Sequence, residues 1–174
     1  RKVLGHNFST LFKQQIGDER VTNLIDLINT RYPTEVILFD IAKEQDTRRV
    51  TQRIAEFIYT ALLRELGYAE DFDIAELEIE LEAEGKLEQF IAKCREIHGQ
   101  EWRIVRKGAQ RISRASAILH ELDPDTYPAA DSWARTQRNH DAAITIRKVV
   151  DRTFELFGRR RPGKAVAFII DEVG

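Results

Sequence analysis

The chain contains no methionine, and its 174 residues include one cysteine, four prolines and nine glycines. The single Cys94 excludes an internal disulfide and favours a reducing compartment, so we expect a cytoplasmic protein. No apolar run approaches the roughly 18 residues that a membrane-spanning helix needs, and no secretory signal is evident, so we expect no membrane partner. The net charge of −2 provides no overall attraction for nucleic acid or anionic lipid.

The composition is typical of a folded, helix-rich protein. Hydrophobic residues make up 43% and charged residues 32%, which argues against disorder. The length is sufficient for one domain with its own core, or for one domain with an additional lobe. The missing initiator methionine and the very apolar run close to Gly174 lead us to expect a piece of a longer protein.

Residues 1–45 combine helical periodicity with one strand pattern. Apolar residues at Val3, Leu4, Phe8, Leu11 and Phe12 share one helical face and predict a helix over residues 1–15. A second helix is predicted from an Asp18 N-cap to the Tyr32-Pro33 pair. Residues 36–39 are a short continuous apolar run, which predicts a strand over residues 35–41 that is buried on both faces.

Residues 46–138 carry helical patterns and no convincing strand. Four helices are predicted, over residues 46–66, 74–84, 87–97 and 102–122. The segment Asp123–Pro128 is rich in turn residues and is the clearest linker of the chain. A crossover between parallel strands needs only a dozen or so residues, so we expect this region to be a helical insertion that forms its own lobe.

An acidic stretch lies within this insertion. From Glu65 to Glu84 there are nine acidic residues and no basic one. Residues 76–82 alternate as a strand would, but Glu, Leu and Ala favour a helix whose buried stripe is Ile74, Leu77 and Leu81. The acidic stretch could bind a basic partner or mimic nucleic acid, or it could be an exposed face of the insertion. The Arg-rich segment 103–114 is a better electrostatic partner for the acidic stretch than either segment is for an outside ligand.

Residues 139–174 predict a helix followed by a second strand. The helix has Ala143, Ile146, Val150, Phe154 and Phe157 on one face and is expected to end at Gly158. A basic run, Arg159–Arg161 with Lys164, follows; it suits DNA or phosphate across a subunit interface, or simply a solvated loop. Residues 165–170 predict the strand. Since two strands make an unstable sheet, further strands must come from elsewhere.

The strand over residues 165–170 ends in Asp171-Glu172, which is the Walker B pattern of P-loop ATPases. Buried parallel strands deliver their last residues to the carboxyl edge of the sheet, where ligands bind. There Asp171 would hold Mg²⁺ and Glu172 would polarise the attacking water. The competing interpretation is a core strand that meets solvent at an acidic turn. No G-x-x-x-x-G-K-[ST] loop is present, and Gly163-Lys164 is rejected because it precedes a strand rather than a helix.

The sequence from Val149 through the run Arg159–Lys164 to Asp171-Glu172-Val173-Gly174 resembles the Walker B region of the large ATPase of BREX phage-defence systems. That family is called BrxC, or PglY in the phage-growth-limitation variant. Residues 1–6 resemble the helix after its P-loop. The resemblance implies an α/β, predominantly helical fold in which residues 1–45 and 139–174 form part of a P-loop sheet with few parallel strands, interrupted by the insertion.

The resemblance also implies a function. The intact protein would hydrolyse ATP with Mg²⁺, with Asp171 on the metal side and Glu172 as the catalytic carboxylate, while the chain alone lacks the phosphate loop and is expected to be inactive. Implied partners are other BREX proteins, DNA contacted indirectly, and further copies of the ATPase. The alternatives are a helical protein-interaction module without activity and a magnesium-dependent phosphoesterase, for which no cluster of carboxylates is evident.

Other residues that could carry chemistry are interpreted as structural. His6, His98, His120 and His140 lack metal-ligand spacing, and Cys94 has no second thiol nearby in sequence, so no zinc site is expected. Cys94 also falls on the apolar face of its helix, which favours a core residue over a nucleophile. Trp102 and Trp133 are predicted to be packing residues.

Overall fold

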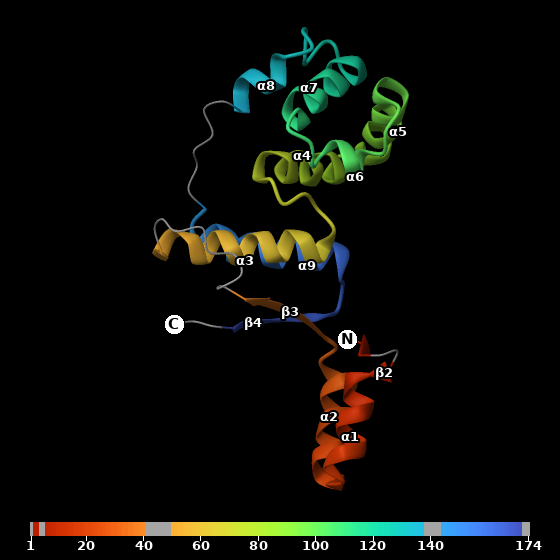
Figure 1. Cartoon of the computed structure of the whole chain (residues 1–174), viewed down its shortest axis with the longest axis vertical. Coiled ribbons are helices and arrows are strands. Elements are labelled where there is room, and N and C mark those ends of the chain that lie inside the picture. The colour runs from red at the N-terminus through yellow and green to blue at the C-terminus, as the bar shows by residue number, and fades with distance from the viewer. Residues whose placement is uncertain (1, 4–5, 41–49, 138–143, 172–174) are drawn as a thin grey trace. The chain divides into compact units, whose positions relative to one another are not determined.

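The computed structural model describes residues 2–3, 6–40, 50–137 and 144–171. The chain divides into two compact units, which are described separately. Arg1–Lys43 with Arg152–Gly174 form one, here called the sheet unit, and Glu44–Asp151 form the other, the helical unit. The described chain is predominantly helical, and its two longest strands pair in parallel (Figure 1). None of its helices is both long enough and apolar enough to cross a membrane.

The sheet unit begins with two very short strands and a helical hairpin. Strand β1 (Lys2–Val3) pairs antiparallel with β2 (His6–Asn7), and α1 (Phe8–Ile16) follows. The prediction of a helix from residue 1 is therefore wrong for its first half, because this strand pairing takes up the backbone groups that a helix would use. Helix α2 (Glu19–Arg31) begins as predicted, with the Asp18 carboxylate accepting from the backbone N–H groups of Arg20 and Val21.

Both predicted strands are present and lie side by side. Strand β3 (Thr34–Asp40) pairs in parallel with β4 (Ala165–Asp171), from Thr34 opposite Ala165 to Asp40 opposite Asp171 (Figure 1). The expectation of burial on both faces is wrong for the described residues. Ile37 is buried, but Val36 and Ile169 remain 45% and 50% exposed. They share one face of the sheet, because side chains alternate along a strand, so that face is about half exposed at these positions.

Helix α9 (Ile146–Arg160) precedes β4 and differs from its prediction in three ways. Residues 139–143, where the helix was predicted to start, lie outside the described residues. In the structure, the side-chain and backbone oxygens of Thr145 accept hydrogen bonds from the backbone N–H groups of Lys148 and Val149 in the first turn of α9. The helix also continues through Gly158, since one glycine costs only about 1 kcal/mol. Its buried face is rotated from the predicted one. The exposed fractions of Ile146 and Phe154 are 73% and 78%, whereas the buried residues are Val149, Thr153, Leu156 and Phe157.

Within its described residues the helical unit contains six complete helices and the first six residues of α9. The complete helices are α3 (Val50–Leu66), α4 (Phe72–Ala83), α5 (Leu87–His98), α6 (Trp102–Val105), α7 (Arg111–Leu122) and α8 (Ser132–Gln137). The single helix predicted over residues 102–122 is wrong, because it is two helices separated by a turn at Gly108. The backbone N–H of Gly108 donates to Val105 O, and that of Arg111 donates to Gly108 O, so the turn satisfies its own backbone groups.

The alternating Glu-Leu segment is helix α4, as its composition predicted. Ile74, Leu77 and Leu81 are buried, which confirms the predicted stripe. Ala75, Glu78 and Ile79 are buried as well, so α4 is enclosed on more than one side. Of its carboxylates, Glu78 is buried and Glu76 and Glu82 are partly buried, but Glu80 and the C-cap Glu84 are exposed. The interpretation of the acidic stretch as an exposed face is therefore wrong for Glu78 and holds for Glu80 and Glu84.

The buried carboxylate of Glu78 organises the helical unit. Glu78 is 2% exposed, and its carboxylate accepts hydrogen bonds from three donors in two segments of the chain. The donors are the backbone N–H of Ala69 at 2.7 Å, the indole N–H of Trp102 at 2.6 Å and the guanidinium of Arg106 at 2.9 Å. One side chain thus connects α4 to the loop after α3 and to both ends of α6.

Glu78→Ala is expected to lower the free energy of unfolding by about 3 kcal/mol, because it leaves the Arg106 charge and two further donors without their acceptor. Urea denaturation followed by tryptophan fluorescence measures this change. Glu121→Ala is the matched control, since Glu121 is exposed on α7, and we expect a change within about 0.5 kcal/mol. A loss below about 1 kcal/mol for Glu78→Ala would contradict the role of this carboxylate.

Candidate functional site at the carboxyl edge of the parallel strands

The register of the two parallel strands brings two aspartates to one edge of the sheet. Asp40 is the last residue of β3 and Asp171 is the last residue of β4, and they are paired positions. Neighbouring strands lie about 4.8 Å apart, so the two backbone positions are adjacent. The carboxyl edge of a parallel sheet is where ligands of open α/β folds bind. This edge is therefore the candidate functional site.

Of the two predicted site residues, Asp171 and Glu172, the structure describes the backbone of Asp171 only. Asp171 is described as the final backbone position of β4, in agreement with the expectation that a strand delivers it to this edge. Glu172, the predicted catalytic carboxylate, lies outside the described residues. The sequence reasoning missed Asp40 as a companion. The sequence did contain a signal for Asp40, because β3 has the same pattern as β4, an apolar strand that ends in aspartate.

The opposite edge of the same strands is held by a charged clamp. Lys164 donates to the Glu35 carboxylate at 2.6 Å, and the guanidinium of Arg161 lies 3.9 Å from the same oxygen. The backbone N–H of Ala165 donates to Pro33 O at 2.9 Å. These contacts join the start of β4 to the start of β3 and so fix the register that aligns Asp40 with Asp171.

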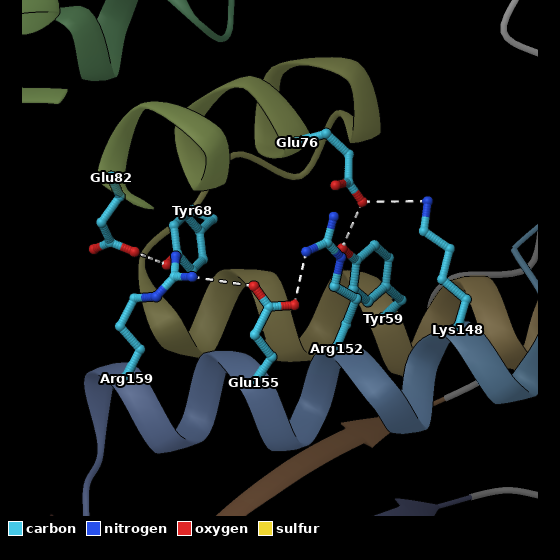
Figure 2. A network of polar contacts seen from close by, with 8 residues as sticks. All are labelled: Tyr59, Tyr68, Glu76, Glu82, Lys148, Arg152, Glu155 and Arg159. Carbon is cyan, nitrogen blue, oxygen red and sulfur yellow. Dashed lines mark hydrogen bonds and ion pairs between the residues drawn. The ribbon is translucent and has the colours of Figure 1, made fainter. Parts of the chain in front are cut away.

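The basic run is therefore not part of the candidate site. Glu35 precedes Asp40 by five residues along an extended strand, which corresponds to about 17 Å. Arg159, the first residue of the run, lies 3.1 Å from Glu155 one turn earlier on α9, and Arg152 lies 2.8 Å from the other oxygen of Glu155 (Figure 2). Within the sheet unit, Lys164 and Arg161 hold the sheet together at the edge remote from Asp171.

Part of the acidic stretch of the helical unit is neutralised by basic residues inside that unit. Glu78 pairs with Arg106, and Asp71 accepts two hydrogen bonds from the Arg111 guanidinium at 2.8 and 2.6 Å. These two pairs confirm the prediction that the Arg-rich segment is the electrostatic partner of the acidic one.

Two further acidic side chains of this stretch have partners within the helical unit. Glu76 accepts from the Tyr59 hydroxyl at 3.1 Å and lies 3.3 Å from the Lys148 ammonium (Figure 2). Glu82 accepts from the Tyr68 hydroxyl. The middle of the acidic stretch thus serves internal bonding rather than an external ligand.

Other candidate residues have structural surroundings. Cys94 is buried, and Trp102 packs edge-on against Phe90 with ring centroids 4.8 Å apart, so both predictions of core residues are confirmed. Trp133 is buried too. His120 Nδ1 donates to Tyr127 O at 2.6 Å. In the part of the chain that the structure describes, no three His, Cys, Asp or Glu side chains are grouped as metal ligands would be.

No protein-family model matches the chain. No solved structure is significantly similar to it. The features of this chain that bear on function are the geometry of the sheet edge and the resemblance in sequence over residues 149–174.

Cys94 is expected to resist thiol reagents in the folded chain. Burial raises the pKa of its thiol, so less of the reactive thiolate is present at a given pH, and the sulfur is enclosed. Labelling with Ellman's reagent at pH 8 should be at least about 100-fold slower in buffer than in 8 M urea. Equal rates in the two solvents would contradict the enclosed position of Cys94.

Proposed function

We propose that this chain supplies part of the nucleotide-binding sheet of a P-loop ATPase of the BREX phage-defence type. The observation that carries the proposal is the parallel register that ends with Asp40 beside Asp171. A strand pair with acidic residues at its carboxyl edge suits a site for a metal-bound nucleotide. The Walker B pattern and the resemblance over residues 149–174 supply the specific family.

In this proposal the two consecutive carboxylates have different roles. Asp171 is the oxygen ligand on the magnesium side, and Mg²⁺, when bound, would neutralise charge on the nucleotide phosphates. Glu172 acts as the general base that orients and polarises the attacking water. The clamp of Lys164 and Arg161 on Glu35 supports the reaction indirectly, because it holds the register of the strand that carries Asp171.

The phosphates themselves would be held by a loop that residues 1–174 do not contain. Partners in this proposal are other BREX proteins and further copies of the ATPase, and DNA would be contacted indirectly. The rival function is a helical interaction module without catalysis. It is distinguished by the carboxylate variants below, because a protein of that kind has no turnover to lose.

The 174-residue chain alone is expected to bind Mg-ATP with a Kd weaker than about 1 mM, because most phosphate affinity in this class resides in the Gly-rich loop and its lysine. Isothermal titration calorimetry measures this directly, with the Asp171→Ala chain as a matched control. A micromolar Kd that Asp171→Ala leaves unchanged would mean that the phosphates are held elsewhere within these residues.

In the full-length protein, Glu172→Gln is expected to lower kcat for ATP hydrolysis by at least about 100-fold while ATP still binds, since the amide keeps the shape of the side chain but is not a base. Asp171→Ala should instead weaken Mg²⁺-dependent nucleotide binding about tenfold. Phosphate release and binding of a fluorescent ATP analogue are the two measurements. Glu88→Gln, an exposed position on α5, is the control. Turnover at the parent rate in Glu172→Gln would refute the catalytic assignment.

A further inference from the structure

A cleft in the helical unit combines an apolar floor with an acidic rim. It measures about 300 Å³ and lies between the C-terminal half of α4, the start of α5 and the end of α7. The floor is made by leucines from α4 and α7, namely Leu77, Leu81, Leu119 and Leu122. The rim carries three carboxylates, Glu80, Glu84 and Asp123, and one ammonium, Lys86. Its volume is at the lower limit of ligand pockets, enough for one or two side chains.

The electrostatic potential of this cleft is negative for two independent reasons. Its rim has three carboxylates for one ammonium, and Lys86 already lies 2.8 Å from Glu84. In addition, α4 and α7 both end here, and helix C-termini carry a partial negative charge of about half an electron. The N-terminus of α5 carries a partial positive charge, which opposes the negative potential only on the side of the cleft where α5 starts.

The charges at the end of α4 are also opposite to those that stabilise a helix. Its last turn contains no basic residue, and Glu80, Glu82 and the C-cap Glu84 add negative charge where the helix dipole is already negative. Each such carboxylate is unfavourable by some tenths of a kcal/mol to about 1 kcal/mol. A local choice that costs stability is expected where a function requires it. The arrangement therefore favours a cationic ligand at this end.

The rim is held in place before any ligand binds. Asp123 accepts from the backbone N–H of Thr126 at 3.1 Å, and His120 fixes the loop by its bond to Tyr127 O. Burial raises the pKa of the Tyr127 phenol, and the nearby carboxylates of Glu80, Asp123 and Glu84 raise it further. The hydrogen bond and charge of Glu84 likewise raise the pKa of Lys86. The nearby carboxylates thus raise the pKa of both Tyr127 and Lys86, as the negative potential of the cleft requires.

We propose that this cleft binds a basic segment of a partner protein, with an arginine or lysine side chain between the rim carboxylates and an adjacent leucine-like side chain on the leucine floor. A metal ion fits poorly, because the described carboxylates do not converge as metal ligands and an ammonium stands among them. A segment that is both basic and apolar matches both parts of the lining. This inference goes beyond the proposed ATPase function and does not depend on it.

The test uses the complete 174-residue chain and a fluorescein-labelled peptide of sequence Leu-Arg-Leu-Leu-Arg, measured by fluorescence anisotropy at 0.15 M salt. The comparison peptide replaces arginine by the neutral isostere citrulline. We expect saturable binding of the arginine peptide and at least tenfold weaker binding of the citrulline peptide. In the chain, Glu80→Gln with Asp123→Asn should weaken the arginine peptide at least tenfold, because the amides keep the shapes and remove two rim charges.

The matched control is Glu88→Gln with Glu121→Gln, which removes the same net charge from exposed positions outside the cleft lining. We expect the control to change the affinity less than twofold, and circular dichroism establishes that both double variants are folded. Three results would overturn the proposal. They are no saturable binding of the arginine peptide, equal affinity for the citrulline peptide, and equal losses in the two double variants, which would indicate attraction by overall charge alone.

Discussion

The helical unit depends on the hydrogen bonds that the buried carboxylate of Glu78 accepts. A charge removed from water is stable only when it is paired and hydrogen-bonded, and Glu78 meets that condition with Ala69, Trp102 and Arg106. These donors come from two places along the chain, so the carboxylate holds the loop after α3 and the short helix α6 against α4. The apolar packing around α4 then follows from that placement.

Charge is used differently in the two units. In the sheet unit, Glu35 binds Lys164 and Arg161 at one edge, and this clamp leaves the acidic residues Asp40 and Asp171 together at the other edge. In the helical unit, Arg106, Arg111 and Lys148 pair with Glu78, Asp71 and Glu76 of the acidic stretch. The rim of the cleft at the end of α4 retains more carboxylates than cations, which is the basis of the ligand proposed for it.

The candidate site was predictable in part. The apolar run that ends in Asp171 identified one strand and its carboxyl edge from sequence alone, because a buried strand and a following acidic residue form a local pattern. Asp40 was not recognised, since nothing local in the sequence states which strands are neighbours. Only the pairing of β3 with β4, across more than a hundred intervening residues, makes the two aspartates adjacent.

The sequence alone was enough for the class of most elements. Spacing and composition predicted β3 and β4, the helices of residues 50–122 in outline, and the helical character of the alternating Glu-Leu segment, because these depend on local preference. They did not predict α8, nor β1 and β2, which lie within the helix expected over residues 1–15. The tertiary structure decided which faces are buried. Helix α9 has two apolar faces, and the one with Val149, Leu156 and Phe157 is buried while Phe154 is exposed. It also decided that Glu78 lies inside, because the donors that satisfy a buried carboxylate are distant in sequence and meet only in the folded chain.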